Sequence, residues 1–152
     1  MGKYHMRKQE QEITDEFELR DIINKGKYAI ITMSKNNEQY IVTLSYGYDG
    51  INNNLYFHTG TKGLKLDFIQ SNPNVCATII DDMGYINGEC GHEYRSIVMV
   101  GKMSIMEDMN EKKHGMEIVL NHLEQAPTII KERVLKNDEA YNSIVVLKLE
   151  IS

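Results

Sequence analysis

The pattern of apolar and polar residues along the chain predicts a mainly β protein with short helices around it. Most of the strand-like runs follow one another through short turns, without long crossover helices between them. This order favours an antiparallel barrel over a doubly wound parallel sheet. We therefore expect a six-stranded antiparallel barrel with peripheral helices, in a single domain over residues 1–152. The expected strands are residues 28–34, 40–46, 55–59, 75–80, 94–106 and 143–151.

Helical spacing of apolar residues occurs in segments before, between and after these strands. Thr14 is placed to cap the first helix, which Gly26 ends. The second helix must stop before Pro73, because proline cannot continue a helix. The polar stretch 81–93 is expected to be a loop, and Gly101 indicates a bulge or a close approach of another backbone. The expected helices cover residues 15–25, 61–71, 110–123 and 127–134.

Composition and charge argue against several classes of protein. The longest apolar runs are far shorter than the roughly 20 residues of a membrane-spanning helix. Residues 1–12 are charged and polar, with no apolar core before a cleavage site, so we expect a flexible basic arm and no secretory signal. The net charge of −5 argues against binding to duplex nucleic acid. Two cysteines, Cys76 and Cys90, do not suggest a disulfide framework, and we expect a cytoplasmic protein without nucleic-acid or membrane partners.

The strongest chemical signal is the segment 59–65, between an expected strand and an expected helix. Its sequence, TGTKGLK, combines glycines, threonine hydroxyls and two lysines, Lys62 and Lys65. Amide groups at a helix N-terminus and lysine ammonium groups both attract anions, so the segment can hold a phosphate. The residues alone also fit an ordinary polar turn with solvated lysines. Their spacing matches neither a P-loop nor the dinucleotide-binding fingerprint.

The stretch from Leu55 through Lys65 to Pro73 resembles the flavin-binding split-barrel superfamily of pyridoxamine 5'-phosphate oxidase. A second motif, YRSIVMVG at residues 94–101, follows in the order found in the nitroimidazole-resistance branch of that superfamily. The resemblance covers about residues 27–123 of the chain. It implies a split barrel of the FMN-binding type.

The resemblance also implies how the phosphate of FMN is held. Lys65 matches the lysine that contacts the phosphate in this superfamily. Gly63 and Leu64 stand where the oxidase has a Ser-Arg pair, which weakens one pair of phosphate ligands. Thr61 or Lys62 is the expected substitute for that pair.

The same resemblance implies where the rest of the cofactor lies. Residues 43–46 would line the isoalloxazine ring, although without the resemblance they read as an ordinary strand with Leu44 and Tyr46 on one face. His58 would lie beside the ring and is the candidate catalytic residue, because imidazole titrates near neutral pH and can orient or protonate a substrate. A lone histidine on a strand also fits a purely structural role. The candidate cofactor-binding residues are Thr43, Leu44, Ser45, Tyr46, His58, Thr59, Thr61, Lys62, Gly63, Lys65, Arg95 and Ser96.

The function implied by the resemblance is that of an FMN-dependent oxidoreductase similar to nitroimidazole reductases. Such a protein passes electrons from a reduced donor to a small, electron-poor acceptor, and the flavin carries the chemistry. The resemblance also implies a homodimer with the flavin at the subunit interface, so that Arg95 and Ser96 would reach the cofactor of the same or the other subunit. The alternative is a flavin-binding or haem-binding module without turnover, because fold alone does not separate these functions.

A metal site is not expected. Cys90, His92 and Glu93 lie close in sequence, and Cys76 or His58 could be added to them. A structural zinc site needs paired ligands such as Cys-x-x-Cys, and this spacing does not supply four ligands.

Overall fold

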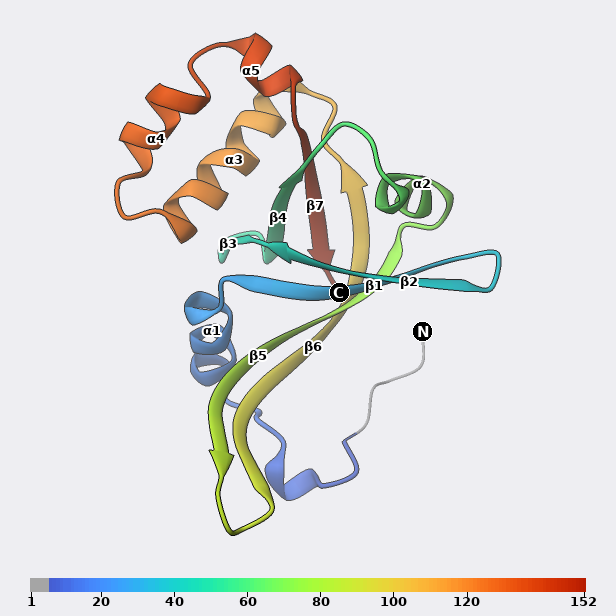
Figure 1. The fold of residues 1–152 in the computed structure, drawn as a ribbon, viewed down its shortest axis with the longest axis vertical. Coiled ribbons are helices and arrows are strands. Elements are labelled where there is room, and N and C mark those ends of the chain that lie inside the picture. The colour runs from blue at the N-terminus through green and yellow to red at the C-terminus, as the bar shows by residue number, and fades with distance from the viewer. Residues whose placement is uncertain (1–5) are drawn as a thin grey trace.

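The structure of the protein is a computed structural model that describes residues 6–152 (Figure 1), so the first part of the expected basic arm lies outside the described residues. The strands are β1 (Tyr28–Lys35), β2 (Glu38–Ser45), β3 (Gly47–Asp49), β4 (Asn54–Thr59), β5 (Asn74–Ile86), β6 (Gly91–Ile105) and β7 (Val145–Ile151). The helices are the short 3-10 helix η1 (Gln9–Gln11) and the α-helices α1 (Glu16–Lys25), α2 (Leu64–Ser71), α3 (Met109–Leu123), α4 (Pro127–Val134) and α5 (Asp138–Asn142).

All strands belong to one antiparallel sheet with the order β2-β1-β5-β6-β7-β4-β3. The expected mainly β architecture with peripheral helices is confirmed, but the six-stranded barrel is wrong, because the sheet has seven strands and is not closed. The two edge strands, β2 and β3, are consecutive in the chain, and only Tyr46 separates them. Within residues 6–152 no ladder joins these two edges. The sheet curls so that β2 contacts β4. This contact is near the junction between β2, which pairs with β1, and β3, which pairs with β4.

Strand β3 forms in a stretch whose sequence indicates a turn, because helix α3 supports it. Gly47 pairs with Tyr56 of β4, while a Cβ atom at Gly47 would lie 2.5 Å from the backbone of Val119. Only a glycine allows the helix to approach the strand so closely. The sequence Gly-Tyr-Asp-Gly has low strand propensity, so its strand conformation comes from this tertiary contact.

The stretch 81–93 is not a loop, because β5 and β6 continue as a long hairpin through most of it. The ladder shifts register between Asp82 and Gly84, and Gly84 has a φ of 101°, a backbone conformation that favours glycine. Figure 1 shows the hairpin extending away from the rest of the sheet, where both of its faces meet solvent. A two-sided exposed hairpin has no apolar alternation, which explains why its sequence resembles a loop.

The close approach expected at Gly101 is confirmed. A Cβ atom at this position would overlap the backbone carbonyl of Glu150 on the neighbouring strand β7. The β5–β6 pairing is regular on both sides of Gly101, and the β6–β7 ladder begins at this residue, so the glycine serves the contact and not a bulge.

The helices begin and end where local chemistry requires. Asp15, not Thr14, caps α1, and its carboxylate accepts a hydrogen bond from the amide of Phe17 at 3.3 Å. Helix α2 begins at Leu64 and not at residue 61, because the preceding Gly63 has a φ of 150° that is incompatible with a helix. Helix α4 has the expected bounds, and the five-residue helix α5 was not expected.

The core has two parts on opposite faces of the sheet. The inward residues of the strands form the main cluster together with apolar side chains of α1 and α2. A second cluster lies on the other side of β4 and β7 and includes residues of α3, the helix that Figure 1 shows beside these strands. In β1 the inward positions Ala29, Ile31 and Met33 are buried, whereas the alternate positions face outward. Among residues 6–152, no helix is both long and apolar enough to cross a membrane.

Candidate functional site

The N-terminus of α2 gathers the groups expected to hold a phosphate. Gly63 occupies the N-cap position, and no side chain caps the first amides of the helix. The ammonium group of the half-buried Lys65 lies 3.6 Å from where a Cβ atom of Gly63 would be, so the lysine folds back over the glycine. Uncapped amides and an ammonium group at one place form an anion-binding arrangement. Thr61 and Lys62 are exposed in the turn just before it.

His58 and Thr59 end strand β4 and lead directly into this turn. The alternation of β4 buries Leu55 and Phe57 in the core and leaves His58 exposed. Gly47 pairs with Tyr56, so extending that antiparallel register by two residues in each strand places Ser45 level with His58. The contact between β2 and β4 lies at this end of β2. The structure therefore brings the end of β2 next to the expected catalytic histidine.

The residues expected along the isoalloxazine ring divide between the two faces of β2. Thr43 and Ser45 are exposed on the outer face, whereas Leu44 is half-buried against the core. The side chain of Tyr46 is fully buried, and its hydroxyl donates a 2.5 Å hydrogen bond to the carbonyl of Ile23. Burial raises the pKa of this hydroxyl well above its ordinary value. A ligand on the outer face could therefore contact only the backbone atoms of Leu44 and Tyr46.

Arg95 faces the side of the sheet on which α1 lies. Its guanidinium donates hydrogen bonds to Asp81 at 2.6 Å and to Asp21 at 2.9 Å, and Glu18 lies 3.6 Å away. Two of these carboxylates come from α1, so Arg95 ties that helix to the β5–β6 hairpin. Hydrogen bonds from Arg95 and then Lys25 hold the pKa of Asp21 below its ordinary value.

Ser96 faces the opposite side and belongs to the outer face of the sheet. It pairs with Ile80 of β5, in the same row as Tyr28 of β1 and Ser45 of β2. Three strand spacings separate β2 from β6 in this sheet, or about 14 Å at ~4.8 Å for each spacing. Within one chain the structure therefore does not bring Ser96 to the end of β2.

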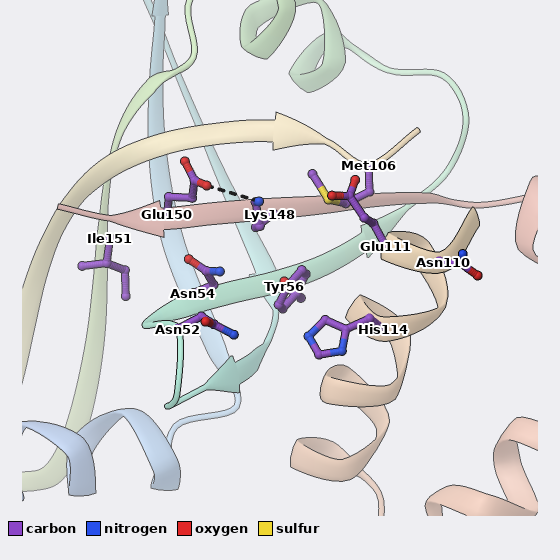
Figure 2. Close-up of a pocket in the computed structure, with 10 residues that line it drawn as sticks. All are labelled: Asn52, Asn54, Tyr56, Met106, Asn110, Glu111, His114, Lys148, Glu150 and Ile151. Carbon is purple, nitrogen blue, oxygen red and sulfur yellow. Dashed lines mark ion pairs between the residues drawn. The ribbon is translucent and has the colours of Figure 1, made fainter. Parts of the chain in front are cut away.

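A cavity that the sequence did not indicate lies between α3 and the strands β4 and β7 (Figure 2). Its volume is about 650 Å³. The lining residues come from separate segments of the chain, and their sequence carries no shared motif that could have revealed them. They are Asn52, Asn54, Tyr56, Met106, Asn110, Glu111, His114, Lys148, Glu150 and Ile151.

Asp49, behind the wall of this cavity, is a buried carboxylate with several donors around it. It accepts hydrogen bonds from the amide of Ile51 at 3.1 Å and from the side chain of Asn52 at 2.9 Å, and His114 lies 3.7 Å away. Burial acts to raise its pKa, but these hydrogen bonds together hold the pKa below its ordinary value. Asp49 is therefore a charged residue that fixes the turn after β3.

The residues weighed as metal ligands are spread over the β5–β6 hairpin and its neighbours. Cys90 is exposed at the hairpin tip, and Cys76 is half-buried on the outer face of β5. The ring of His92 lies 2.5 Å from the carboxylate of Asp82. In the part of the chain from residue 6 onward, no three His, Cys, Asp or Glu side chains are grouped so that they could hold a metal ion.

The sequence matches the family model described as pyridoxamine 5'-phosphate oxidase over residues 15–152, and the chain belongs to that family. The family expected from the sequence is thereby confirmed. A comparison with curated proteins finds no significant match.

Solved structures agree with the family. A candidate 5-nitroimidazole antibiotic resistance protein from Bacteroides thetaiotaomicron is 26% identical, with a TM-score of 0.75 over 92% of this chain and 81% of that one. An FAD- and haem-binding protein from Mycobacterium smegmatis is 14% identical, with a TM-score of 0.70 over 92% of this chain and 68% of that one. An FAD-binding protein from Mesorhizobium loti is 17% identical, with a TM-score of 0.63 over 91% and 90% of the two chains. The last two similarities concern the fold alone.

Proposed function

We propose that the protein is an FMN-binding oxidoreductase that passes electrons from a reduced donor to a small, electron-poor acceptor. The observation that carries this proposal is the meeting of Lys65 with the uncapped amides of α2, a helix that packs against β2, where the rings of Phe68 and Tyr40 lie 5.4 Å apart. These donors fit a phosphate, and the glycine at position 63 leaves room for it. Bound FMN would supply the electron transfer, and the protein would bind and orient it.

Each part of FMN has residues suited to it. The phosphate would be held by Lys65, Gly63, Lys62 and Thr61, with the hydroxyl of Thr59 beside them. The isoalloxazine ring would lie along β2, which is an edge strand and therefore leaves alternate backbone amides and carbonyls without a strand partner. The hydroxyls of Thr43 and Ser45 face the same side, and the backbone of Leu44 and Tyr46 completes the strand.

His58 is the residue that we assign to the acceptor. It is exposed at the end of β4, level with Ser45, and so would lie between the phosphate site and the ring. From this position the imidazole would orient the acceptor or deliver a proton to it.

We further propose a homodimer formed through the outer face of β2, β1, β5 and β6. No helix of residues 6–152 covers this face, although it carries large exposed apolar side chains. Several large exposed apolar side chains on one uncovered face are typical of an interface with another protein chain. A second copy would bring a second Ser96 toward the flavin, which one chain alone does not do. The exposed apolar residues on this face and its hairpin are Tyr28, Ile41, Ile80, Met83, Tyr85, Ile86, Tyr94 and Val98.

A second candidate function is that of a flavin- or haem-binding module without turnover. The similar fold of the FAD- and haem-binding protein from Mycobacterium smegmatis favours this candidate. The two candidates share the fold and differ only in whether a bound cofactor is reduced and reoxidised.

Absorption spectroscopy of the purified full chain separates the two candidates. We expect a yellow protein whose flavin band bleaches when NADH or NADPH is added without oxygen, and recovers when an electron-poor nitroaromatic compound follows. A flavin band that neither donor bleaches would favour the binding module, and a Soret band would favour haem. A colourless protein that does not take up added FMN would contradict both forms of the flavin proposal.

The phosphate site is tested separately, by FMN titration of Lys65→Ala. Loss of a charge-assisted hydrogen bond should weaken FMN binding about 10- to 100-fold. Lys136→Ala is the matched control, because Lys136 is an exposed lysine between α4 and α5, away from the site. If Lys65→Ala binds FMN as tightly as the control, the phosphate lies elsewhere.

A further inference from the structure

The cavity between α3 and the strands β4 and β7 is separate from the proposed flavin site. None of the residues assigned to FMN lines it. Asn54 and His58 are four residues apart on β4, which corresponds to about 13 Å at ~3.3 Å per residue. Figure 2 shows the side chains of Tyr56, Lys148 and Glu111 around the same space, from β4, β7 and α3 respectively.

The charges of the cavity wall are unevenly paired. Lys148 is mostly buried, and its ammonium lies 3.2 Å from the carboxylate of Glu150, so these two charges offset each other. Glu111, in the first turn of α3, forms no ion pair with any of residues 6–152. With His114 neutral, the wall carries one positive and two negative formal charges, a net charge of −1. The unpaired charge is therefore a carboxylate, which opposes an anionic ligand.

The carboxylate of Glu111 influences the pKa of Tyr56, and both residues line the cavity. Burial raises the pKa of the Tyr56 hydroxyl, and the negative charges of Asp49 and Glu111 act in the same direction. Asn54 and the ammonium of Lys148 act in the opposite direction on this pKa, and both residues line the cavity together with Tyr56 and Glu111. The polar groups thus converge on one small volume, which is the usual feature of a ligand site.

We propose that this cavity binds a small organic amine, with the ammonium group of the amine on the carboxylate of Glu111. The amide oxygen of Asn54 would accept a second hydrogen bond from the ammonium. Met106 and Ile151 provide apolar surface for the carbon chain of the ligand. A metal ion is the weaker match, because no three His, Cys, Asp or Glu side chains are grouped for one in the described chain.

A matched series of four-carbon probes tests the proposal by NMR titration of the flavin-loaded protein. At neutral pH, n-butylamine is a cation, butanol is neutral and butyrate is an anion. We expect butylamine to bind about tenfold more tightly than the other two, the ratio that one charge-assisted hydrogen bond provides. Its binding should shift the signals of Tyr56 and His114 and leave the flavin spectrum unchanged.

Glu111→Gln removes the charge and keeps the shape of the side chain. It should abolish the preference for butylamine, whereas Glu124→Gln, at the exposed C-terminal end of the same helix, should preserve it. Equal binding of all probes to the natural chain would overturn the proposal. It would also be overturned by an unchanged preference in a folded Glu111→Gln variant, or by a preference for butyrate that Lys148→Met removes. Because the flavin spectrum is recorded in the same samples, a failure here is distinguishable from a failure of FMN binding.

Discussion

The hydroxyl of Tyr46 donates a 2.5 Å hydrogen bond to the backbone carbonyl of Ile23. Tyr46 is the one residue between β2 and β3, and Ile23 lies in the last turns of α1. The ring of Tyr46 also packs against His122 of α3, with 4.9 Å between the ring centres. One buried side chain therefore links two helices to the junction between β2, which pairs with β1, and β3, which pairs with β4.

Tyr46→Phe is expected to destabilise the protein without releasing the flavin. The substitution leaves the buried carbonyl of Ile23 without its partner, which should lower the free energy of unfolding by about 1–2 kcal/mol. Urea denaturation measures this change. Tyr85→Phe is the control, because Tyr85 is 61% exposed and should tolerate the change. A Tyr46→Phe variant of normal stability that has lost FMN would instead show that the Tyr46 hydroxyl contacts the cofactor.

The elements predicted from the sequence are those whose structure depends on local chemistry. Helix α4 has the expected bounds because Pro127 can start a helix and apolar spacing carries it to Val134. The residues favourable to strands in the runs 28–34 and 40–46, with a polar turn between them, identified β1 and β2. In contrast, β3 depends on α3 for its conformation, and the β5–β6 hairpin is exposed on both faces, so neither element has a periodic sequence.

The candidate site was predictable only in part, for the same reason. Lys65 and His58 lie on one continuous segment, and a motif there has a fixed local geometry. The relation between His58 and Ser45 depends instead on the curl of the whole sheet. The pairing of Arg95 with carboxylates of α1 and β5 is likewise a tertiary contact that no spacing in the sequence indicates.

Gly101→Ala is expected to be strongly destabilising, because the added methyl group would overlap the carbonyl of Glu150. That carbonyl belongs to the backbone of β7 and cannot turn away as a flexible side chain can. We expect a loss of about 2–3 kcal/mol in the free energy of unfolding, as overpacking of a rigid contact produces. Gly91→Ala serves as the control in the same strand, since a Cβ there would meet only an ordinary contact at 3.8 Å. Equal thermal unfolding midpoints for the two variants would contradict the close approach of β6 and β7.

His122 should make the protein less stable as the solution becomes mildly acidic. Burial lowers its pKa below the ordinary value of 6.5, and the neutral ring lies 2.7 Å from the carbonyl of Gly26. The unfolded chain therefore takes up the proton first, so stability is lost as the pH falls below about 6.5 toward the folded-state pKa. Denaturation at a series of pH values should show that the free energy of unfolding changes less steeply with pH in His122→Gln than in the natural chain. If the slope between about pH 7 and pH 5 is the same in both proteins, other groups cause it.

Val98→Lys should separate the subunits of the proposed dimer and weaken FMN binding with it. Val98 is 40% exposed at the centre of the uncovered outer face, and it pairs with Thr78 in the β5–β6 ladder. Two-fold symmetry would place the new charges of both subunits in one apolar interface, where unpaired charges are costly. Ile129→Lys is the control, because Ile129 is 63% exposed on α4, away from this face. Light scattering after gel filtration should give a monomer for Val98→Lys and a dimer for Ile129→Lys. A dimeric Val98→Lys protein with normal FMN affinity would mean that the subunits associate through another surface.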